Sequence, residues 1–296
     1  MLRAYAWLIN FSNPSGIVTE FLLNQTSLKA VGLCNLPIGS QERIAKLLNV
    51  PMEQVRLETV SLNHCGAITG VHVGGENVLP HMLDPRALNH AAQQDAWIQN
   101  YRPMIELLGA IPNDYLQYFF SHDRKLSEQR AAMQTRGEAC IEIESRLLSY
   151  YADERNRNVP AMLAERGGHL YSEAAIALIA SLSGAEPGYH VVDVQNHGVI
   201  DFLSENSVIE TCCYVGKDSI SRMPLTVQPG ETLRSLLTSV KAYETLTVQA
   251  AMTGDRQTAL RALACNPITS DLDKVKPCLE EMLEQNRSLL PRFFPL

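Results

Sequence analysis

The sequence predicts an α/β fold in which the end of a parallel sheet is followed by a larger α+β region. Three patterns support this prediction: a strand, a helix and a strand open the chain, more strands lie near its middle, and strongly periodic helices fill its last third. With 296 residues, of which 46% are hydrophobic, the chain can bury a sizeable core as one large domain or two modest ones.

The first part of the chain has the pattern of a strand–helix–strand unit. The apolar runs 6–11 and 30–34 predict strands, and residues 17–23 between them predict a helix. Two apolar strands joined by a crossover helix are typical of a parallel sheet that is covered on both faces. Because two strands cannot bury those faces alone, we expect the chain to begin in the middle of a domain, with exposed edges that favour association.

Helices and strands follow one another through the rest of the chain. After Pro37, a helix is expected from Gly39, because Ile44, Leu47 and Leu48 fall on one face. Further strands are expected within 60–78, around a turn at 74–77, and at 190–194, 198–200 and 207–211. Further helices are expected from about residue 84 to 108 and at 141–150, 173–182, 233–240 and 256–264.

The composition excludes several classes of partner. Lysine and arginine number 25 against 32 aspartates and glutamates, and the basic residues form no patch, so no nucleic-acid partner is expected. No apolar run approaches the roughly 20 residues that span a bilayer, and no secretory signal opens the chain, so we expect a cytoplasmic protein with no membrane partner. Seven cysteines, including the adjacent Cys212 and Cys213, fit reduced thiols better than a disulfide framework.

Cys34 and His64 are candidate metal ligands. Each follows an apolar strand and stands beside an asparagine, Asn35 or Asn63. Thiolate and imidazole suit Mn, Fe, Co or Zn better than Mg or Ca, and two protein ligands leave positions open for substrate and water, as at a catalytic metal. A buried cysteine that only packs and a histidine that is only hydrogen-bonded in place explain the same residues. The spacing alone leaves both interpretations open.

Several short motifs follow one another along nearly the whole chain. They are Ser12-Asn13-Pro14, Cys34-Asn35-Leu36-Pro37-Ile38-Gly39, Leu62-Asn63-His64, Ile111-Pro112-Asn113-Asp114-Tyr115-Leu116-Gln117-Tyr118, Arg136-Gly137-Glu138, Asn196-His197-Gly198 and Val248-Gln249-Ala250-Ala251. In this order they resemble glycoside hydrolase family 4, whose members are NAD- and divalent-metal-dependent 6-phospho-α- and 6-phospho-β-glucosidases, α-galactosidases and α-glucuronidases built like lactate and malate dehydrogenases. The resemblance implies that residues 1–36 are the remnant of a Rossmann-type NAD-binding domain. It implies that residues 37–296 are a C-terminal α+β domain that binds substrate and metal.

The resemblance also implies roles for the residues that carry the chemistry. Cys34 and His64 resemble the ligands of the family's divalent metal, usually Mn²⁺, and Tyr115 resembles its general base. A free tyrosine has a pKa near about 10, so Tyr115 would need the nearby cation to favour its phenolate.

Four further residues resemble the family's contacts with the sugar phosphate. Asn13 and Arg130 match substrate-binding residues, and the forked guanidinium of arginine suits an oxyanion. Asn35 and Asn63 are left between two roles, donating to sugar hydroxyls and orienting the metal ligands.

The implied reaction is the hydrolysis of 6-phospho-β-glucosides by oxidation, elimination, addition and reduction. NAD⁺ would take hydride from C3 of the sugar and later return it, Tyr115 would remove the proton from C2, and the metal would act as a Lewis acid. Asn35 stands where the α-specific phosphoglucosidases carry an aspartate, which favours β-glucosides. No NAD-binding residue can be assigned, because the family's glycine-rich loop has no match here. We therefore expect a truncated chain that is incomplete as a catalyst and that assembles as a homodimer or homotetramer.

Three alternatives remain open from the sequence. A degenerate homologue would only bind a sugar phosphate or oligomerise, and an α-glycosidase of the same family is the second alternative. A 2-hydroxy-acid dehydrogenase relative would share the fold, but the sequence shows no counterpart of the His and Asp pair of those enzymes.

Overall fold

Twenty-two helices and strands are present in residues 6–167 and 170–294, which the computed structural model describes. The strands are β1 Trp7–Asn10, β2 Lys29–Gly32, β3 Val55–Leu62, β4 Cys65–Val73, β5 Glu76–Asn77, β6 Ile111–Pro112, β7 Gly188–Gln195, β8 Val208–Gly216 and β9 Ser219–Arg222. The helices are α1 Ser15–Gln25, α2 Leu36–Leu48, α3 Leu79–Met82, α4 Pro85–Gln94, α5 Ala96–Leu108, α6 Gln117–Phe120, α7 His122–Ala131, α8 Arg136–Ala152, α9 Met162–Arg166, α10 Tyr171–Ser183, α11 Glu231–Thr253, α12 Arg256–Cys265 and α13 Leu272–Gln285.

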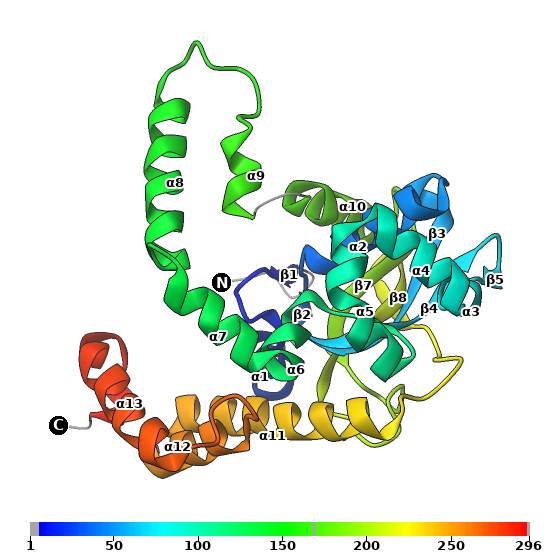
Figure 1. Cartoon of the computed structure of the whole chain (residues 1–296). Coiled ribbons are helices and arrows are strands. Elements are labelled where there is room, and N and C mark those ends of the chain that lie inside the picture. The colour runs from blue at the N-terminus through cyan, green and yellow to red at the C-terminus, as the bar shows by residue number, and fades with distance from the viewer. Residues whose placement is uncertain (1–5, 168–169, 295–296) are drawn as a thin grey trace.

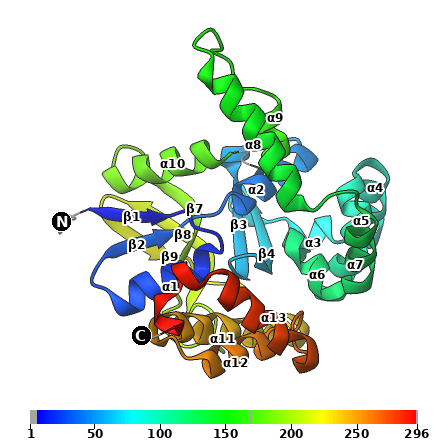
Figure 2. The same ribbon diagram turned by 90° about the vertical axis from the view of Figure 1, so that its left-hand side faces the viewer.

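One mixed sheet of nine strands joins these elements within the described residues. Its strand order is β1-β2-β7-β8-β3-β4-β5, with β6 beside β4 and β9 beside β8. Figures 1 and 2 show the sheet as a middle layer, with α2 and α10 on one side and α1, α11 and α12 on the other. The predicted α/β class with a following α+β region is therefore confirmed.

The strand–helix–strand unit at the start of the chain forms as predicted. β1 and β2 are parallel, with Leu8 opposite Ala30, and α1 is the crossover between them. The next neighbour of β2 is the antiparallel strand β7, which comes from far along the sequence. The predicted boundary between residues 1–36 and 37–296 stays a prediction, and β2 and β7 share one sheet across it.

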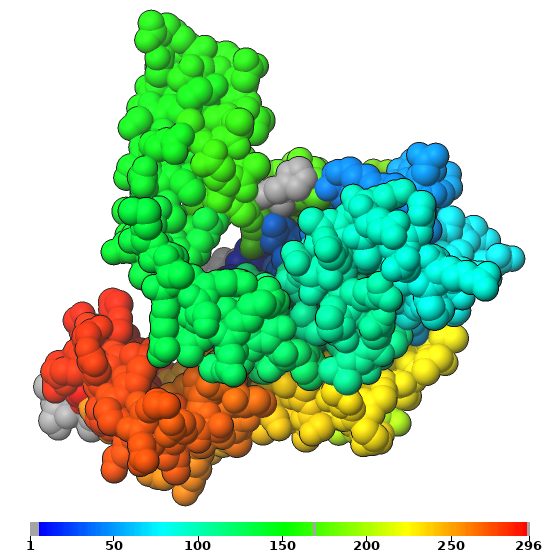
Figure 3. All heavy atoms as spheres, in the orientation of Figure 1, coloured from blue at the N-terminus to red at the C-terminus, as the bar shows by residue number. Residues whose placement is uncertain are grey.

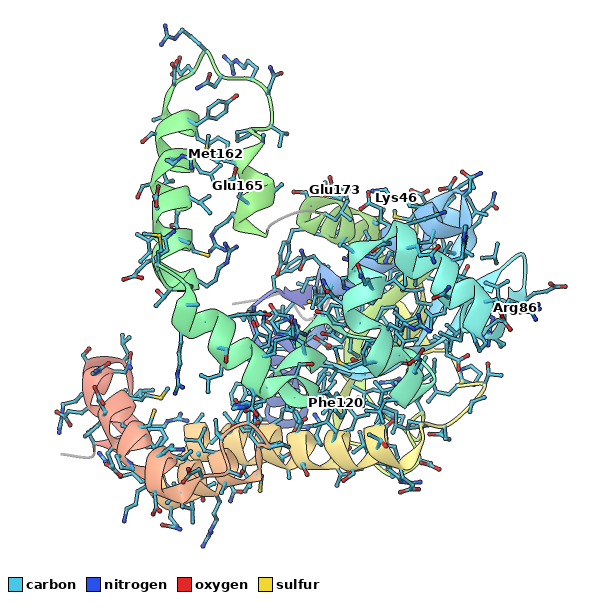
Figure 4. The ribbon with its side chains drawn as sticks, in the orientation of Figure 1. Lys46, Arg86, Phe120, Met162, Glu165 and Glu173 are labelled. Carbon is cyan, nitrogen blue, oxygen red and sulfur yellow. The ribbon has the colours of Figure 1, made fainter. Side chains whose placement is uncertain are left out.

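The core consists of apolar layers on both faces of the sheet. Leu62, Leu116 and Leu237 are fully buried in the cluster between β3, β4, α5 and α11. Phe120, at the end of α6 close to α11, packs against the same cluster (Figure 4). On the other face Leu178 of α10 packs with Val192. Each fully buried side chain of this size stabilises the fold by about 1.5–3 kcal/mol, which makes the sheet a firm base for a site.

The segment 198–200 differs from its prediction, because it is a turn and not a strand. The buried side chain of Asn196 replaces the partner strand: its amide donates to the carbonyl oxygens of Ile200 and Leu203, and its Oδ1 accepts from the Ile200 N–H at 2.7 Å. The Ile200 side chain is fully buried in the core, which explains why this position is apolar although it lies in a turn. Several further elements, among them α7, β9 and α13, lie outside the ranges that the sequence patterns predicted.

The helices α7, α8 and α9 form an arm that projects from the body (Figures 1 and 2). The space-filling view shows a hollow between this arm and the body, with N-terminal residues visible at its bottom (Figure 3). Among the described residues, none of the helices combines the length and the apolar character that a bilayer crossing needs. All seven cysteines are free thiols, which confirms the prediction from their number and spacing.

Candidate active site

Cys34 and His64 lie together, as the sequence predicts for a pair of ligands. The Cys34 Sγ is 3.6 Å from the His64 Nε2. Cys34 lies between the end of β2 and the start of α2, and His64 lies in the tight turn from β3 to β4. His64 has a left-handed backbone with φ of 67°, which is uncommon for a residue with a Cβ, so its neighbours must hold the turn in place.

Tyr115 stacks on the imidazole of His64. The two ring centroids are 4.3 Å apart, and the planes are inclined by 21°. The Asn113 side chain accepts the Tyr115 N–H at 2.9 Å, and the following Leu116 is fully buried, so the backbone around the phenol is anchored on both sides. Three residues that the sequence singled out therefore form one cluster: a thiol, an imidazole and a phenol.

Asn63 joins this cluster from beneath and is 5% exposed. Its Oδ1 accepts the Ser15 backbone N–H at 2.9 Å, and its Nδ2 donates to the Glu210 Oε1 at 3.0 Å. Because both ends of the amide are engaged inside the protein, these contacts support the orienting role of Asn63. The bond to Ser15 also brings the turn with Asn13, which is exposed, beside the turn with His64.

Asn35 lies at the start of α2, next to Cys34. Its Nδ2 donates to the Gly167 carbonyl oxygen at 3.3 Å, which connects it to the end of α9. Asn35 also lines a cavity of about 350 Å³ together with Arg43, Lys46 and Asp114; Figure 4 shows Lys46 on α2. A larger, mainly apolar cavity of about 420 Å³ lies between α2 and α4–α5.

Burial dominates the proton affinities at the site. It raises the pKa of the Cys34 thiol to about 12, and the charge of Glu210 adds to the shift, whereas hydrogen bonds from the Leu36 backbone and the Asn63 side chain oppose it. Burial lowers the pKa of His64 to about 4. Burial also raises the pKa of Tyr115, with a further contribution from Cys34, and the charge of Arg136 opposes that rise. At neutral pH the imidazole is neutral and can bind a metal, while the thiol and the phenol hold their protons.

The distance between Cys34 and His64 fits a shared divalent cation. A cation about 2.3 Å from a sulfur and about 2.1 Å from a nitrogen, at a roughly tetrahedral angle, needs these atoms about 3.6 Å apart. The same distance also fits a thiol–imidazole hydrogen bond. Within the part of the chain that the structure describes, no group of three or more His, Cys, Asp or Glu side chains could hold a metal ion. A cation here would therefore need ligands from substrate or water.

Arg130 and Arg136 occupy different surroundings. Arg130 lies near the end of α7, where its charge acts on Lys274 of α13. Arg136 opens α8, its charge reaches Tyr115, and its guanidinium donates to the Glu165 carbonyl oxygen at 2.9 Å. The sequence motif at 136–138 pointed to this place without a role for the arginine.

Tyr171 is a second residue that the sequence did not indicate. Cys34 and Tyr115 both contribute to the raised pKa of its phenol, after burial, and its ring packs 5.3 Å from that of Phe11. No pattern around Tyr171 distinguishes it from other tyrosines at the start of a helix.

Comparison with known proteins covers nearly the whole chain. The sequence model described as "Family 4 glycosyl hydrolase C-terminal domain" matches residues 60–269, and the model described as "Family 4 glycosyl hydrolase" matches residues 2–50. A probable 6-phospho-beta-glucosidase of Bacillus subtilis is 35% identical over 98% of this chain and 67% of its own length. The phospho-alpha-glucosidase PagL of Clostridium acetobutylicum is 23% identical over 97% of the chain and 68% of its own length.

Among solved structures, the 6-phospho-beta glucosidase from Thermotoga maritima with manganese, NAD⁺ and glucose-6-phosphate superimposes with a TM-score of 0.84. The two sequences are 31% identical over 97% of this chain and 67% of the other. The chain thus spans about two thirds of the length of the proteins that it matches.

Proposed function

The chain belongs to the family 4 glycosyl hydrolases, and from this membership we propose that it serves the hydrolysis of 6-phospho-β-glucosides with Mn²⁺ and NAD. The observation that carries the proposal is the cluster of Cys34, His64 and Tyr115, in which a thiol and an imidazole lie 3.6 Å apart under a stacked phenol. The T. maritima relative was solved with both cofactors and with glucose-6-phosphate, which supports the same ligands for this chain.

The β preference rests on two observations. The B. subtilis β-glucosidase relative is 35% identical, whereas the α-glucosidase relative from C. acetobutylicum is 23% identical. Asn35 also stands beside Cys34 as a neutral amide, where an acid would be needed to protonate the leaving group of an α-glucoside. An α-glycosidase of the same family is the second candidate, because relatives of both kinds match the chain.

The residues of the site would divide the work as follows. Cys34 and His64 would hold Mn²⁺, which would supply a Lewis acid for the C2 and C3 oxygens of the sugar, and bound NAD would supply the hydride-transfer chemistry. Tyr115 removes the proton from C2, and the positive charges of the cation and Arg136 favour its phenolate against the effect of burial. Asn35 and Asn13 border the space in which the sugar would lie.

The phosphate and the aglycone require further contacts. The cavity beside Asn35 presents Arg43 and Lys46, whose charges suit a phosphorylated sugar. Both are paired with acids that line the same cavity, Arg43 with Asp114 and Lys46 with Glu42, so a phosphate would have to compete with these carboxylates. Arg130 stays a candidate substrate residue from the family resemblance. The arrangement of Arg136 at the site offers an arginine that could take this role in its place.

The test is an assay of chromogenic 6-phospho-β- and 6-phospho-α-glucosides, with and without NAD⁺ and Mn²⁺. The chain is assayed alone and fused to the part of the T. maritima relative that its match to this chain leaves uncovered. We expect cofactor-dependent turnover of the β-glucoside, and none in Tyr115→Phe. Mn²⁺ binding without turnover in either form would favour a sugar-phosphate-binding homologue instead.

We also propose that the chain associates with copies of itself as a dimer or tetramer. Ile176 and Ile179 on α10 are 66% and 53% exposed, and exposed apolar side chains at helical spacing are typical of an interface. Light scattering after size exclusion measures the mass, and a monomer at micromolar concentration would contradict this expectation.

A further inference from the structure

A chain of hydrogen bonds beneath the candidate active site ends in a buried carboxyl on each side. Glu210 on β8 accepts from the Asn63 amide at 3.0 Å, and Asn63 accepts from the Ser15 backbone N–H at 2.9 Å. The Ser15 hydroxyl in turn donates to Asp193 on β7. The two turns that carry Asn13 and His64 are therefore joined to each other and to two neighbouring strands of the sheet.

The sheet register places these carboxyls between the strands that lead to the two ligands. Gly32 pairs with Asp193, Asp193 with Glu210, and Glu210 with Ser61. Gly32 is near the end of β2, just before Cys34, and Ser61 is near the end of β3, just before His64. The strands that lead to the thiol and to the imidazole are therefore separated in the sheet by the two strands that carry the acids.

Close packing leaves these acids little freedom. A Cβ added to Gly32 would lie 2.4 Å from the Asp193 Oδ2 and 2.4 Å from the Thr19 Oγ1. A Cβ added to Gly66, opposite Ser61 on β4, would lie 2.4 Å from the Ser61 Oγ. The glycines are required because polar side chains fill the space that their own side chains would occupy.

Burying two carboxyl groups in the middle of a sheet carries a free-energy penalty, so we expect them to have a role beyond packing. Asp193 is 1% exposed and Glu210 is 3% exposed. Apolar side chains of similar size would fill the same space without the cost of desolvation. The nearby Lys241 is ion-paired with Glu20 at 2.7 Å and with Glu244 at 2.5 Å on the α1 and α11 side.

We propose that Glu210 and Asp193 are positioning residues, which set the separation of Cys34 and His64 for a divalent cation through their hydrogen bonds to Asn63 and Ser15. Neither acid is assigned a contact with metal or substrate. The inference rests on the proposed function in one respect, that Cys34 and His64 bind the cation. Residues that orient metal ligands through hydrogen bonds change metal affinity by about 10–100-fold when they are removed.

Two substitutions separate the reach of the Glu210 side chain from its carboxyl group. Glu210→Asp keeps the carboxyl group but is one methylene too short to reach Asn63, whereas Glu210→Gln keeps the reach and an acceptor oxygen but replaces the carboxyl group with an amide. Ser61, which is 3.3 Å from Glu210, can accept from the new amide, because its hydroxyl also donates to the Leu62 carbonyl oxygen. Glu205→Gln, at an exposed position in the loop before β8, is the matched control.

The measurement is the Mn²⁺ affinity of the full chain, followed by the electron paramagnetic resonance signal of free Mn²⁺. We expect a loss of about 10–100-fold in Glu210→Asp and less than about threefold in Glu210→Gln and in the control. Losses in both Glu210 variants, in neither, or in Glu210→Gln alone would overturn the proposal. If Glu210→Asp does not fold, Ser61→Ala removes the other donor to Glu210, and an unchanged affinity there would count against the proposal.

Amide hydrogen exchange in the metal-free protein separates this inference from the proposed function. The Ser15 amide should exchange faster in Glu210→Asp but not in Glu210→Gln, because its acceptor Asn63 is then no longer held. Wild-type protein that binds no Mn²⁺ would refute the metal site, whatever the exchange shows. Wild-type binding with equal exchange in all variants would refute the positioning role alone.

Discussion

The middle of the sheet fixes its polar side chains by burial and tertiary hydrogen bonds, whereas the projecting arm leaves most of its side chains exposed. Around Cys34 and His64, polar groups are buried and joined to one another across four strands. In the arm, no residue of α7 or α9 in the described part is buried, and α8 buries Ile143 and Leu147. Thus tertiary packing fixes the proposed metal ligands, whereas Arg136 reaches the site from a helix that is stabilised mainly by its own ends.

The N-terminal end of α8 is stabilised by contacts between residues close in the sequence. Thr135 and Glu138 form a reciprocal capping box, in which the Thr135 N–H donates to the Glu138 carboxylate at 2.7 Å. Ile141, Leu148 and Tyr151 on the same helix are between 54% and 67% exposed. A region of this kind opens locally more easily than a sheet core, so substrate-facing groups on the arm are free to adjust while the ligands stay in place.

Removal of a metal ligand should produce the largest effect in the sheet region. Cys34→Ser and His64→Ala each leave one protein ligand, so Mn²⁺ affinity should fall by at least about 100-fold, more than when a residue that only orients a ligand is changed. Isothermal titration measures the affinity, and Cys278→Ser on the exposed face of α13 is the control. Binding that survives both substitutions would place the metal elsewhere.

The same alanine substitution at two glycines should have opposite effects in the two regions. Gly32→Ala forces a methyl group against Asp193 and Thr19, and should lower the free energy of unfolding by about 3 kcal/mol. In Gly137→Ala, on α8, the added Cβ lies 3.8 Å from its nearest neighbour, the Thr135 Oγ1. This substitution should raise the free energy of unfolding by about 0.4–1 kcal/mol. Urea unfolding compares the two, and equal values would remove the contrast between sheet and arm.

The pH dependence of metal binding should belong to the sheet region alone. Between about pH 6 and pH 9, His64 is neutral because its pKa is lowered to about 4, and Cys34 holds its proton because its pKa is raised to about 12. Binding must release the thiol proton, so Mn²⁺ affinity should rise about tenfold for each unit of pH. Titrations in buffers of different ionisation enthalpy count the released proton, and a flat profile would contradict thiolate ligation.

The helix content of the arm should not change with pH between about pH 6 and pH 9. The backbone N–H and hydroxyl of Thr135 lower the pKa of Glu138, so the carboxylate is ionised throughout this range. A group with a lowered pKa stabilises the folded state above its unfolded value of 4.5, and this contribution is lost as the pH falls through the lowered pKa. The helix content of the arm should therefore decline in acid and stay constant from pH 6 to pH 9.

Loss of the helix cap should give the smallest effect. Thr135→Ala removes one half of the capping box and should destabilise α8 by about 1 kcal/mol, without destabilising the sheet. Hydrogen exchange resolves the two regions, and faster exchange is expected at the first turn of α8 with no change in β8. A matching change in β8 would show that arm and sheet unfold as one unit.

The sequence predicted the elements whose pattern is local. The crossover from β1 to β2, the turn after β4 and the first half of α11 all follow from apolar spacing and turn residues. The turn at 198–200 was mistaken for a strand, because Val199 and Ile200 are apolar for tertiary reasons. The motif order placed Cys34, His64 and Tyr115 at one site, and the structure brings these three together.

What the sequence did not indicate depends on contacts between distant segments. Glu210 and Asp193 look like the solvent-facing residues of ordinary strands, and their burial follows from partners on β2, β3 and α1. Arg136 is separated from Tyr115 by α6 and α7, so no spacing rule connects them. Buried polar networks of this kind become visible once the strand order is known.

The strand order also has a consequence for the synthesis of the protein. β2 and β3 leave the ribosome close together in time, yet β7 and β8, which separate them in the sheet, end only at Gly216. Until then the nascent chain exposes strands without their final neighbours, and the Cys34 thiol without its final surroundings. Long-range pairing of this kind slows folding and leaves time for aggregation, so yield in the cell should depend on chaperones that hold the chain during this interval.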